Sequence, residues 1–91
     1  MLKIVRSNKF IKDLKLAIKR NLDLSLLEEV VMKLARGETL EAKYQDHPLK
    51  GEYSSFRECH IKPDWLLIYY IDDEEIELLL FRTGTHSDLF M

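Results

Sequence analysis

Cysteine, proline and glycine are scarce in this sequence, with one, two and three residues among 91. A single cysteine, Cys59, excludes an internal disulfide and a cysteine-rich zinc site. No segment reaches the roughly 18 consecutive apolar residues of a membrane-spanning helix, and the N-terminal residues lack the apolar run of a signal peptide. We therefore expect a cytoplasmic protein that makes no contact with a membrane.

The size of the chain indicates one domain over residues 1–91. A hydrophobic content of 46% supplies one core, and 91 residues lie near the small end of what folds without disulfides or metals. No repeat, linker or low-complexity segment marks a second domain.

Charge is distributed unevenly around a net value of −2. Residues 1–36 carry nine Lys or Arg against four Asp or Glu, a net of +5, whereas residues 37–91 carry five against twelve, a net of −7. The basic half is suited to a phosphate backbone, but a lysine-rich helix is more often only a solvated surface. Both interpretations stay open on charge alone.

Two helices are predicted in the first half of the chain. Ser7 is suited to cap a helix that continues to about Arg20, and Ser25 begins a capping-box pattern for a second helix, with Asp23 as the alternative cap. Gly37 is a natural stop for the second helix. Because the link between them is short, we expect an antiparallel helix hairpin. The first helix has apolar residues at helical spacing, namely Phe10, Ile11, Leu14, Ala17 and Ile18.

Strands are predicted over residues 2–6, 56–61, 65–71 and 76–83, from apolar runs rich in Ile, Leu, Tyr and Phe. Pro63-Asp64 and residues 72–75 are the expected turns. The sequence thus predicts an α+β fold, β-α-α-β-β-β, in which the two-helix hairpin packs on a four-stranded, mainly antiparallel sheet. Residues 37–55 form a long irregular connection, which is typical of functional segments.

The polar residues best suited to chemistry lie where this sheet would bring them together. His60 and Asp64 flank the turn at Pro63, and Arg82 and His86 follow at the end of the last strand. Antiparallel order makes these two places neighbours, and His47 arrives on the long connection. Imidazoles, a carboxylate and a guanidinium at one edge indicate acid–base chemistry on a phosphodiester.

This set of groups is suited to RNA cleavage by the RNA's own 2′-hydroxyl. A base removes the 2′-OH proton, a cation stabilises the transition state and an acid protonates the departing 5′-oxygen. Such a site requires no metal and no cofactor, and no histidine pair has the helical i,i+4 spacing of common zinc motifs. Trp65 and Phe90 could stack on bases.

Plainer explanations exist for each of these residues. A single histidine is more often a surface residue, Trp65 is more often a core residue, and Arg82 could pair with Glu58 or Asp64. The residues alone therefore leave an enzyme and a structural module about equally open.

Three segments, residues 46–51, 56–69 and 82–90, closely resemble the YafQ branch of the RelE/ParE toxin superfamily, and the match spans essentially the whole chain. The resemblance implies a RelE-like fold and the toxin of a bacterial type II toxin–antitoxin pair. Such toxins act on the ribosome, where they cut mRNA and leave a 2′,3′-cyclic phosphate and a 5′-hydroxyl.

The resemblance also implies roles for the residues that match. His86, with Asp64, would be the acid–base centre, His47 and His60 would assist proton transfer or hold the phosphate, and Arg82 would stabilise transition-state charge. Which group is the base and which the acid stays open. The implied RNA contacts are Trp65, Phe90, Lys50 and Lys62.

The implied partners are the ribosome, mRNA and a dimeric DNA-binding antitoxin similar to DinJ, with the toxin alone expected to be a monomer. Two other functions fit the same fold. One is a ParE-like toxin that inhibits gyrase without catalysis, a branch that generally lacks the histidine cluster. The other is an inactive module that only binds its antitoxin.

Overall fold

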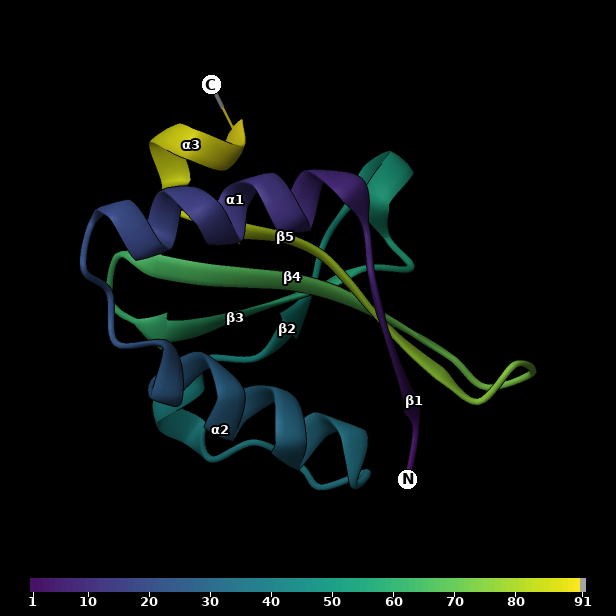
Figure 1. Ribbon diagram of the computed structural model, residues 1–91. Helices are drawn as coiled ribbons and strands as arrows, with labels where there is room; N and C mark the ends of the chain where they lie inside the picture. The colour runs from purple at the N-terminus through teal and green to yellow at the C-terminus, as the bar shows by residue number, and fades with distance from the viewer. Residues whose placement is uncertain (91) are drawn as a thin grey trace.

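The chain forms a five-stranded sheet with its two longer helices on one face (Figure 1). The structure, a computed structural model, describes residues 1–90. Its elements in chain order are β1 (Lys3–Arg6), α1 (Asn8–Lys19), α2 (Leu24–Ala35), η1 (Ala42–Tyr44), β2 (His47–Pro48), η2 (Gly51–Tyr53), β3 (Arg57–Lys62), β4 (Trp65–Asp72), β5 (Glu77–Gly84) and α3 (His86–Phe90).

The strands lie in the order β1-β5-β4-β3-β2. β1 runs parallel to β5, whereas the pairs β2–β3, β3–β4 and β4–β5 are antiparallel. The predicted α+β fold is confirmed, with one strand more than expected. The extra strand, β2, pairs His47 with Glu58 and Pro48 with Arg57. Two residues are too few for a periodic pattern, so this strand could not be predicted.

Both long helices begin at a side-chain cap. The Ser7 hydroxyl accepts a hydrogen bond from the Phe10 amide at 3.0 Å and donates one to the Phe81 carbonyl at 2.6 Å. Asp23, rather than Ser25, caps α2, because its carboxylate accepts from the Ser25 amide at 3.0 Å. Gly37, at φ +77°, follows the C-cap Arg36, as predicted.

The helices run in opposite directions across the sheet, with α1 over β5 and α2 over β3 (Figure 1). They do not pack tightly along their length. A groove of about 490 Å³ opens between them, lined in part by Phe10, Leu14, Leu27 and Val31. Within residues 1–90, no helix has the length and apolar character needed to cross a membrane.

The core lies between the helices and the sheet. Alternate residues of β3 and β4, namely Cys59, Ile61, Leu67 and Tyr69, are buried there against both helices. Burying each large apolar side chain contributes roughly 1.5–3 kcal/mol. The same burial raises the pKa of the Cys59 thiol to about 12, so the thiol stays neutral in the folded protein.

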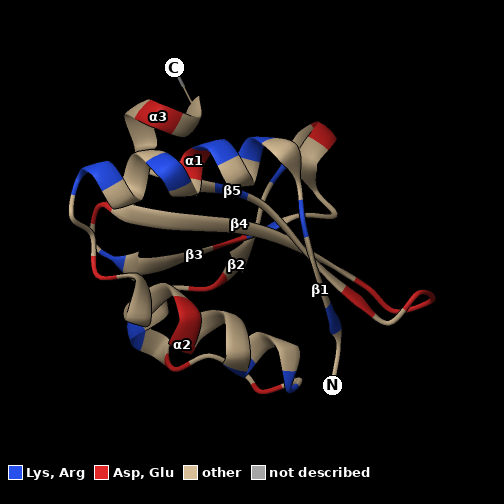
Figure 2. Cartoon of the chain, viewed as in Figure 1, with Lys and Arg blue, Asp and Glu red and all other residues tan. Residues whose placement is uncertain are grey.

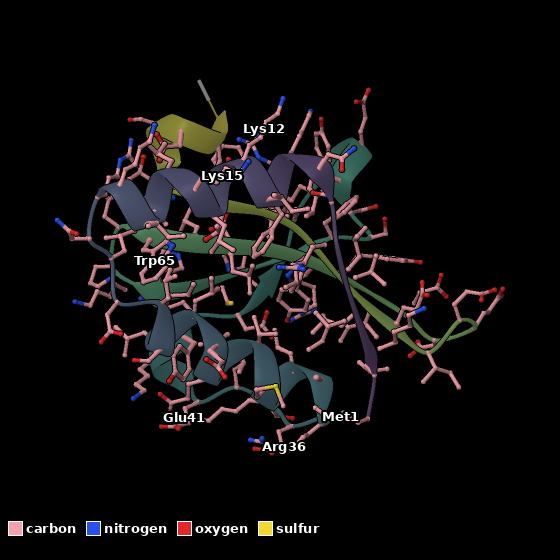
Figure 3. The ribbon with its side chains drawn as sticks, in the orientation of Figure 1. Met1, Lys12, Lys15, Arg36, Glu41 and Trp65 are labelled. Atoms are coloured by element: carbon pink, nitrogen blue, oxygen red, sulfur yellow. The ribbon has the colours of Figure 1, made fainter. Side chains whose placement is uncertain are left out.

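Basic and acidic residues are concentrated on different elements of the fold (Figure 2). Lysines line the outer side of α1, where Lys12 and Lys15 point away from the sheet (Figure 3), while acidic residues gather at the turn between β4 and β5. The basic half recognised in the sequence is therefore largely one helix surface.

Candidate active site

The candidate site lies on the sheet face opposite the helices. Because Cys59 and Ile61 point into the core, the alternate β3 side chains Glu58 and His60 point to the other face. β2 brings His47 beside them, and the β3–β4 turn and α3 contribute Asp64 and His86. Four of the five predicted catalytic residues therefore gather around one end of β3.

Glu58 joins two of the histidines. Its Oε1 lies 3.7 Å from Nε2 of His47 and 3.6 Å from Nε2 of His60, and its side chain is only 7% exposed. The other ring nitrogens face carbonyl oxygens, with Nδ1 of His47 2.7 Å from Gln45 and Nδ1 of His60 3.3 Å from Pro63. Since a carbonyl only accepts, each Nδ1 carries hydrogen and each Nε2 faces the carboxylate. Both Nε2–Oε1 separations are longer than a hydrogen bond, and each histidine forms an ion pair with Glu58 only when it is protonated.

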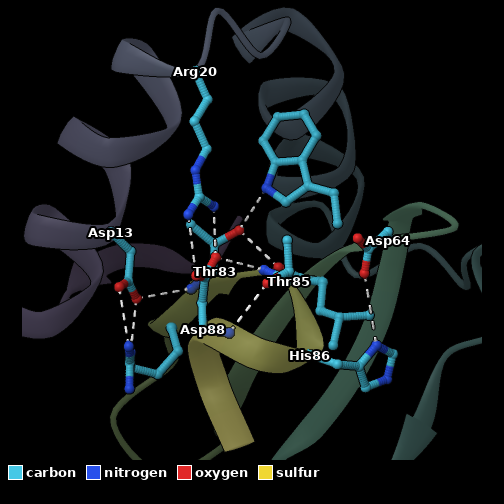
Figure 4. Close-up of polar contacts among 10 residues, drawn as sticks. Asp13, Arg20, Asp64, Thr83, Thr85, His86 and Asp88 are labelled. Carbon is cyan, nitrogen blue, oxygen red and sulfur yellow. Dashed lines mark hydrogen bonds and ion pairs between the residues drawn. The ribbon is translucent and has the colours of Figure 1, made fainter. Parts of the chain in front are cut away.

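His86 completes the histidine cluster from the start of α3. Its ring centroid lies 6.0 Å from that of His60 and 6.1 Å from that of Phe90. Its Nδ1 lies 4.0 Å from the Asp64 carboxylate (Figure 4), and both side chains are well exposed. His86 is therefore the imidazole most accessible to a ligand in solution.

Arg82 is held by a partner that sequence reasoning missed. Its Nε and Nη2 donate to the carboxylate of Asp13 on α1 at 2.7 and 3.0 Å, and the Thr83 amide donates to the same carboxylate at 3.1 Å (Figure 4). The hydrogen bond with Asp13 raises the pKa of Arg82 above its ordinary value. Neither Glu58 nor Asp64, the partners considered from the sequence, forms this pair.

Asp46 fixes the loop that carries His47. Its Oδ1 accepts hydrogen bonds from the Tyr69 hydroxyl at 2.7 Å and from Nε of Arg57 at 3.2 Å. Burial, reinforced by Asp46, raises the pKa of Tyr69, so its hydroxyl stays protonated and able to donate. The aspartate of the Asp46-His47-Pro48 motif is thus a structural residue that sets the position of its neighbour.

Trp65 does not belong to the exposed surface. It is 3% exposed, and its Nε1 donates to the Thr83 hydroxyl at 2.9 Å, which donates in turn to the Leu66 carbonyl at 2.7 Å. Figure 3 places Trp65 between the helices and the sheet. The prediction that its ring stacks on RNA bases is therefore wrong, because the ring faces are covered by protein.

The other predicted RNA contacts are accessible. Phe90 is 53% exposed, and Lys50 and Lys62 are also exposed. A hollow of about 270 Å³ lies between Phe90 and Arg82, with Tyr53 and Phe81 among its walls. It connects Arg82 with the α3 end of the site.

Glu58 was not predicted as a site residue, although the sequence carries a signal for its position. Glu58 and His60 are two residues apart on a predicted strand and must share a face. Asp13 had no such signal, because 69 positions separate it from Arg82. Within residues 1–90, no group of three or more His, Cys, Asp or Glu side chains is arranged to hold a metal ion.

Comparison with known proteins assigns this architecture to a class. The class is that of bacterial toxins of type II toxin–antitoxin systems, because the model of the YafQ family of such toxins matches residues 2–91. The chain belongs to the YafQ family. It is 44% identical to the mRNA interferase toxin YafQ of Escherichia coli K12 over 86 residues, which cover 92% of this chain and 90% of that protein.

Solved structures agree with this assignment. A metal-bound toxin from Helicobacter pylori is 54% identical, with a TM-score of 0.94, over 99% of this chain and 100% of that one. A structure of the E. coli DinJ–YafQ complex contains a chain that is 40% identical, with a TM-score of 0.91 over the full length of both chains.

Proposed function

We propose that this chain is the toxin of a type II toxin–antitoxin pair and cleaves mRNA on the ribosome by a metal-independent reaction. One observation carries the proposal. His47 and His60 share the buried Glu58, and His86 lies 6.0 Å from His60 with Asp64 beside it. Two E. coli relatives at 44% identity are named mRNA interferase toxins, which supports the same activity here.

The proposed reaction is attack by the RNA's 2′-hydroxyl on the adjacent phosphorus. The 2′-oxygen forms a bond to phosphorus and the bond to the 5′-oxygen breaks, which leaves a 2′,3′-cyclic phosphate and a 5′-hydroxyl. One group accepts the 2′-OH proton and another donates a proton to the 5′-oxygen. The chain offers two groups of residues for these transfers. One is Glu58 with His47 and His60, and the other is His86 with Asp64.

Arg82 is the proposed stabiliser of negative charge in the transition state. A guanidinium is permanently charged and can donate hydrogen bonds to phosphate oxygens from more than one of its nitrogens. Asp13 uses Nε and Nη2 of Arg82, and Nη1 takes no part in those two bonds. That nitrogen is the one we expect to face the phosphate.

The proposed RNA surface comprises Phe90, Lys50 and Lys62, with the hollow between Phe90 and Arg82 as a place for a base. Stacking on an aromatic ring contributes roughly 1–3 kcal/mol per base. The proposed RNA surface does not include Trp65, because its side chain is buried. Its bond to Thr83 instead stabilises the end of β5, next to Gly84 and α3.

We also propose a DinJ-like antitoxin as the partner of this toxin. Solved E. coli complexes of DinJ with YafQ chains about 40% identical to this one support that assignment. The proposed cellular setting is the cytoplasm, where ribosome and message are the substrate, and the proposed state of the free toxin is a monomer.

The test compares His86→Ala with Ser87→Ala, its exposed neighbour, as the matched control. Loss of a general acid or base should lower the cleavage rate roughly 10²–10⁴-fold, with growth arrest lost on expression. Primer extension on translated and untranslated message should show cuts only in the translated one. Thermal melts should show that both variants remain folded.

Equal growth arrest by His86→Ala and the unaltered chain would contradict the nuclease proposal. Arrest without mRNA cuts would then support a binding toxin of the gyrase-inhibiting kind. No arrest by either protein would support an inactive antitoxin-binding module.

A further inference from the structure

The C-terminal segment that carries His86 and Phe90 has little of its own to hold it in place. α3 has five residues, none of them buried. Isolated helices shorter than roughly 12–15 residues are marginal in water. The position of His86 over the site must therefore depend on contacts outside α3.

One anchor comes from the far end of the sequence. Nη1 and Nη2 of Arg20, the C-cap of α1, donate to the two carboxylate oxygens of Asp88 at 2.7 and 3.2 Å (Figure 4). This two-pronged geometry fixes both the distance and the orientation of the carboxylate. It joins residues 68 positions apart.

Asp88 passes this constraint to the start of α3. Its Oδ2 accepts from the Thr85 amide at 2.9 Å, and its own amide donates to the Thr85 hydroxyl at 3.1 Å. These reciprocal bonds form a capping box around His86. A fixed Asp88 therefore fixes the turn from which the imidazole projects.

Gly84 is the residue that permits this arrangement. A Cβ atom at position 84 would lie 2.9 Å from Oδ2 and 3.0 Å from Cβ of Asp88. Any side chain there would push Asp88 away from Arg20. The chain thus leaves room at Gly84 for the carboxylate that Arg20 holds.

We propose that Arg20 is a positioning residue of the nuclease site, which acts through Asp88 to set where His86 and Phe90 lie. The inference rests on the proposed nuclease function. Asp13 acts on Arg82 from the same face of α1, two helical turns earlier, so one helix determines the placement of both the cation and the exposed imidazole.

The effect of this anchor should appear in catalysis rather than in global stability. A misplacement of about 1 Å can lower a rate roughly 100-fold, whereas exposed ion pairs contribute little to the free energy of folding. The Arg20 side chain is 42% exposed. We expect Arg20→Ala to lower kcat about 10- to 100-fold with a nearly unchanged Tm.

The experiment measures kcat and KM for mRNA cleavage on programmed ribosomes with the full chain. Lys19→Ala is the matched control, because it removes the same charge from an exposed residue of the same helix turn. Loss of charge attraction to RNA would raise KM equally in both variants. Only Arg20→Ala should lower kcat, and Arg20→Lys, which keeps one charged donor, should recover part of it.

A second readout does not use activity. In NMR spectra, Arg20→Ala should speed hydrogen exchange of the Leu89 amide, which donates to the Thr85 carbonyl at 3.1 Å, and should shift the His86 ring signals. Lys19→Ala should change neither. A normal kcat in Arg20→Ala, or unchanged Leu89 exchange and His86 signals, would overturn the proposal.

The two proposals fail in different ways. If the unaltered chain does not cleave message, the nuclease proposal fails and the catalytic role of Arg20 fails with it. If the unaltered chain cleaves and Arg20→Ala cleaves equally well, only the positioning role is overturned.

Discussion

The two faces of the sheet are built from alternate residues of the same strands, yet they are stabilised in different ways. On the helix face, Cys59, Ile61 and Leu67 are buried in a continuous apolar core. On the opposite face, Glu58 and His60 meet polar groups delivered by a two-residue strand and a five-residue helix. Neighbouring residues of β3 therefore face the apolar core and the candidate site in alternation.

This contrast shows how a chain of 91 residues can hold a polar site. The core face needs only apolar side chains at the right period. The site face depends on individual bonds to distant residues, namely Asp46 to Tyr69, Asp13 to Arg82 and Arg20 to Asp88. Substitutions should therefore divide sharply, with stability lost on one face and activity lost on the other.

The strongest way to test this division on the core face is Leu67→Ala. Leu67 is fully buried between sheet and helices. Truncation of a buried leucine costs roughly 2–5 kcal/mol of unfolding free energy through lost burial and the cavity that remains. Urea unfolding measures it, and a loss below about 1 kcal/mol would show that the core face tolerates truncation like a surface.

The matching change on the site face is Glu58→Gln, which keeps the shape but removes the charge shared by His47 and His60. We expect cleavage to fall about 10- to 100-fold, the lower part of the range for acid–base groups, while the unfolding free energy changes by less than about 1 kcal/mol. Kinetics and urea unfolding on one preparation measure both. Full activity would remove Glu58 from the proposed site.

A smaller effect, with a defined pH dependence, is expected for Asp88→Asn. The hydrogen bond from Arg20 lowers the pKa of Asp88 to about 2, below its ordinary value of 3.8. A lowered pKa in the folded state stabilises the fold above the ordinary value and loses that effect as the pH falls through the folded value.

Asp88→Asn should therefore be less stable than the unaltered chain at pH 7, by about 1 kcal/mol or less because the pair is partly exposed. The difference should disappear as the pH falls from about 4 to 2. Thermal melts across this range measure it. A gap that stays constant down to pH 2 would mean that the charge of Asp88 has no part in it.

The fold could be predicted from the sequence because its signals are local. Apolar residues at helical or strand spacing, Ser7 as a cap and Gly37 as a stop each fix a boundary within one or two residues. β2 could not be predicted, since it has no period of its own and forms only because β3 offers an edge. The sequence allows either Asp23 or Ser25 to cap α2. Only the folded backbone shows that Asp23 is the cap.

The sequence predicted that the histidines of the candidate site would lie close together, but it did not predict the residues that hold the site in place. Histidines beside turns revealed His47, His60 and His86. Asp13 and Arg20 looked like ordinary residues of a solvated helix, because the positions they bind lie 68 or 69 residues away. The prediction that Trp65 contacts RNA failed because its position in the motif does not reveal its burial. The ring is buried in the core that the helices form with the sheet.

The proposed reaction uses the RNA's own 2′-hydroxyl as the nucleophile, while the protein's side chains only move protons and stabilise charge. It can be tested with a message that carries a single 2′-deoxynucleotide on the 5′ side of the mapped cut, assayed on ribosomes with the unaltered chain. We predict that cleavage at that position disappears while an all-ribose message is cut normally. Cleavage of the deoxy-substituted position at the normal rate would contradict this mechanism.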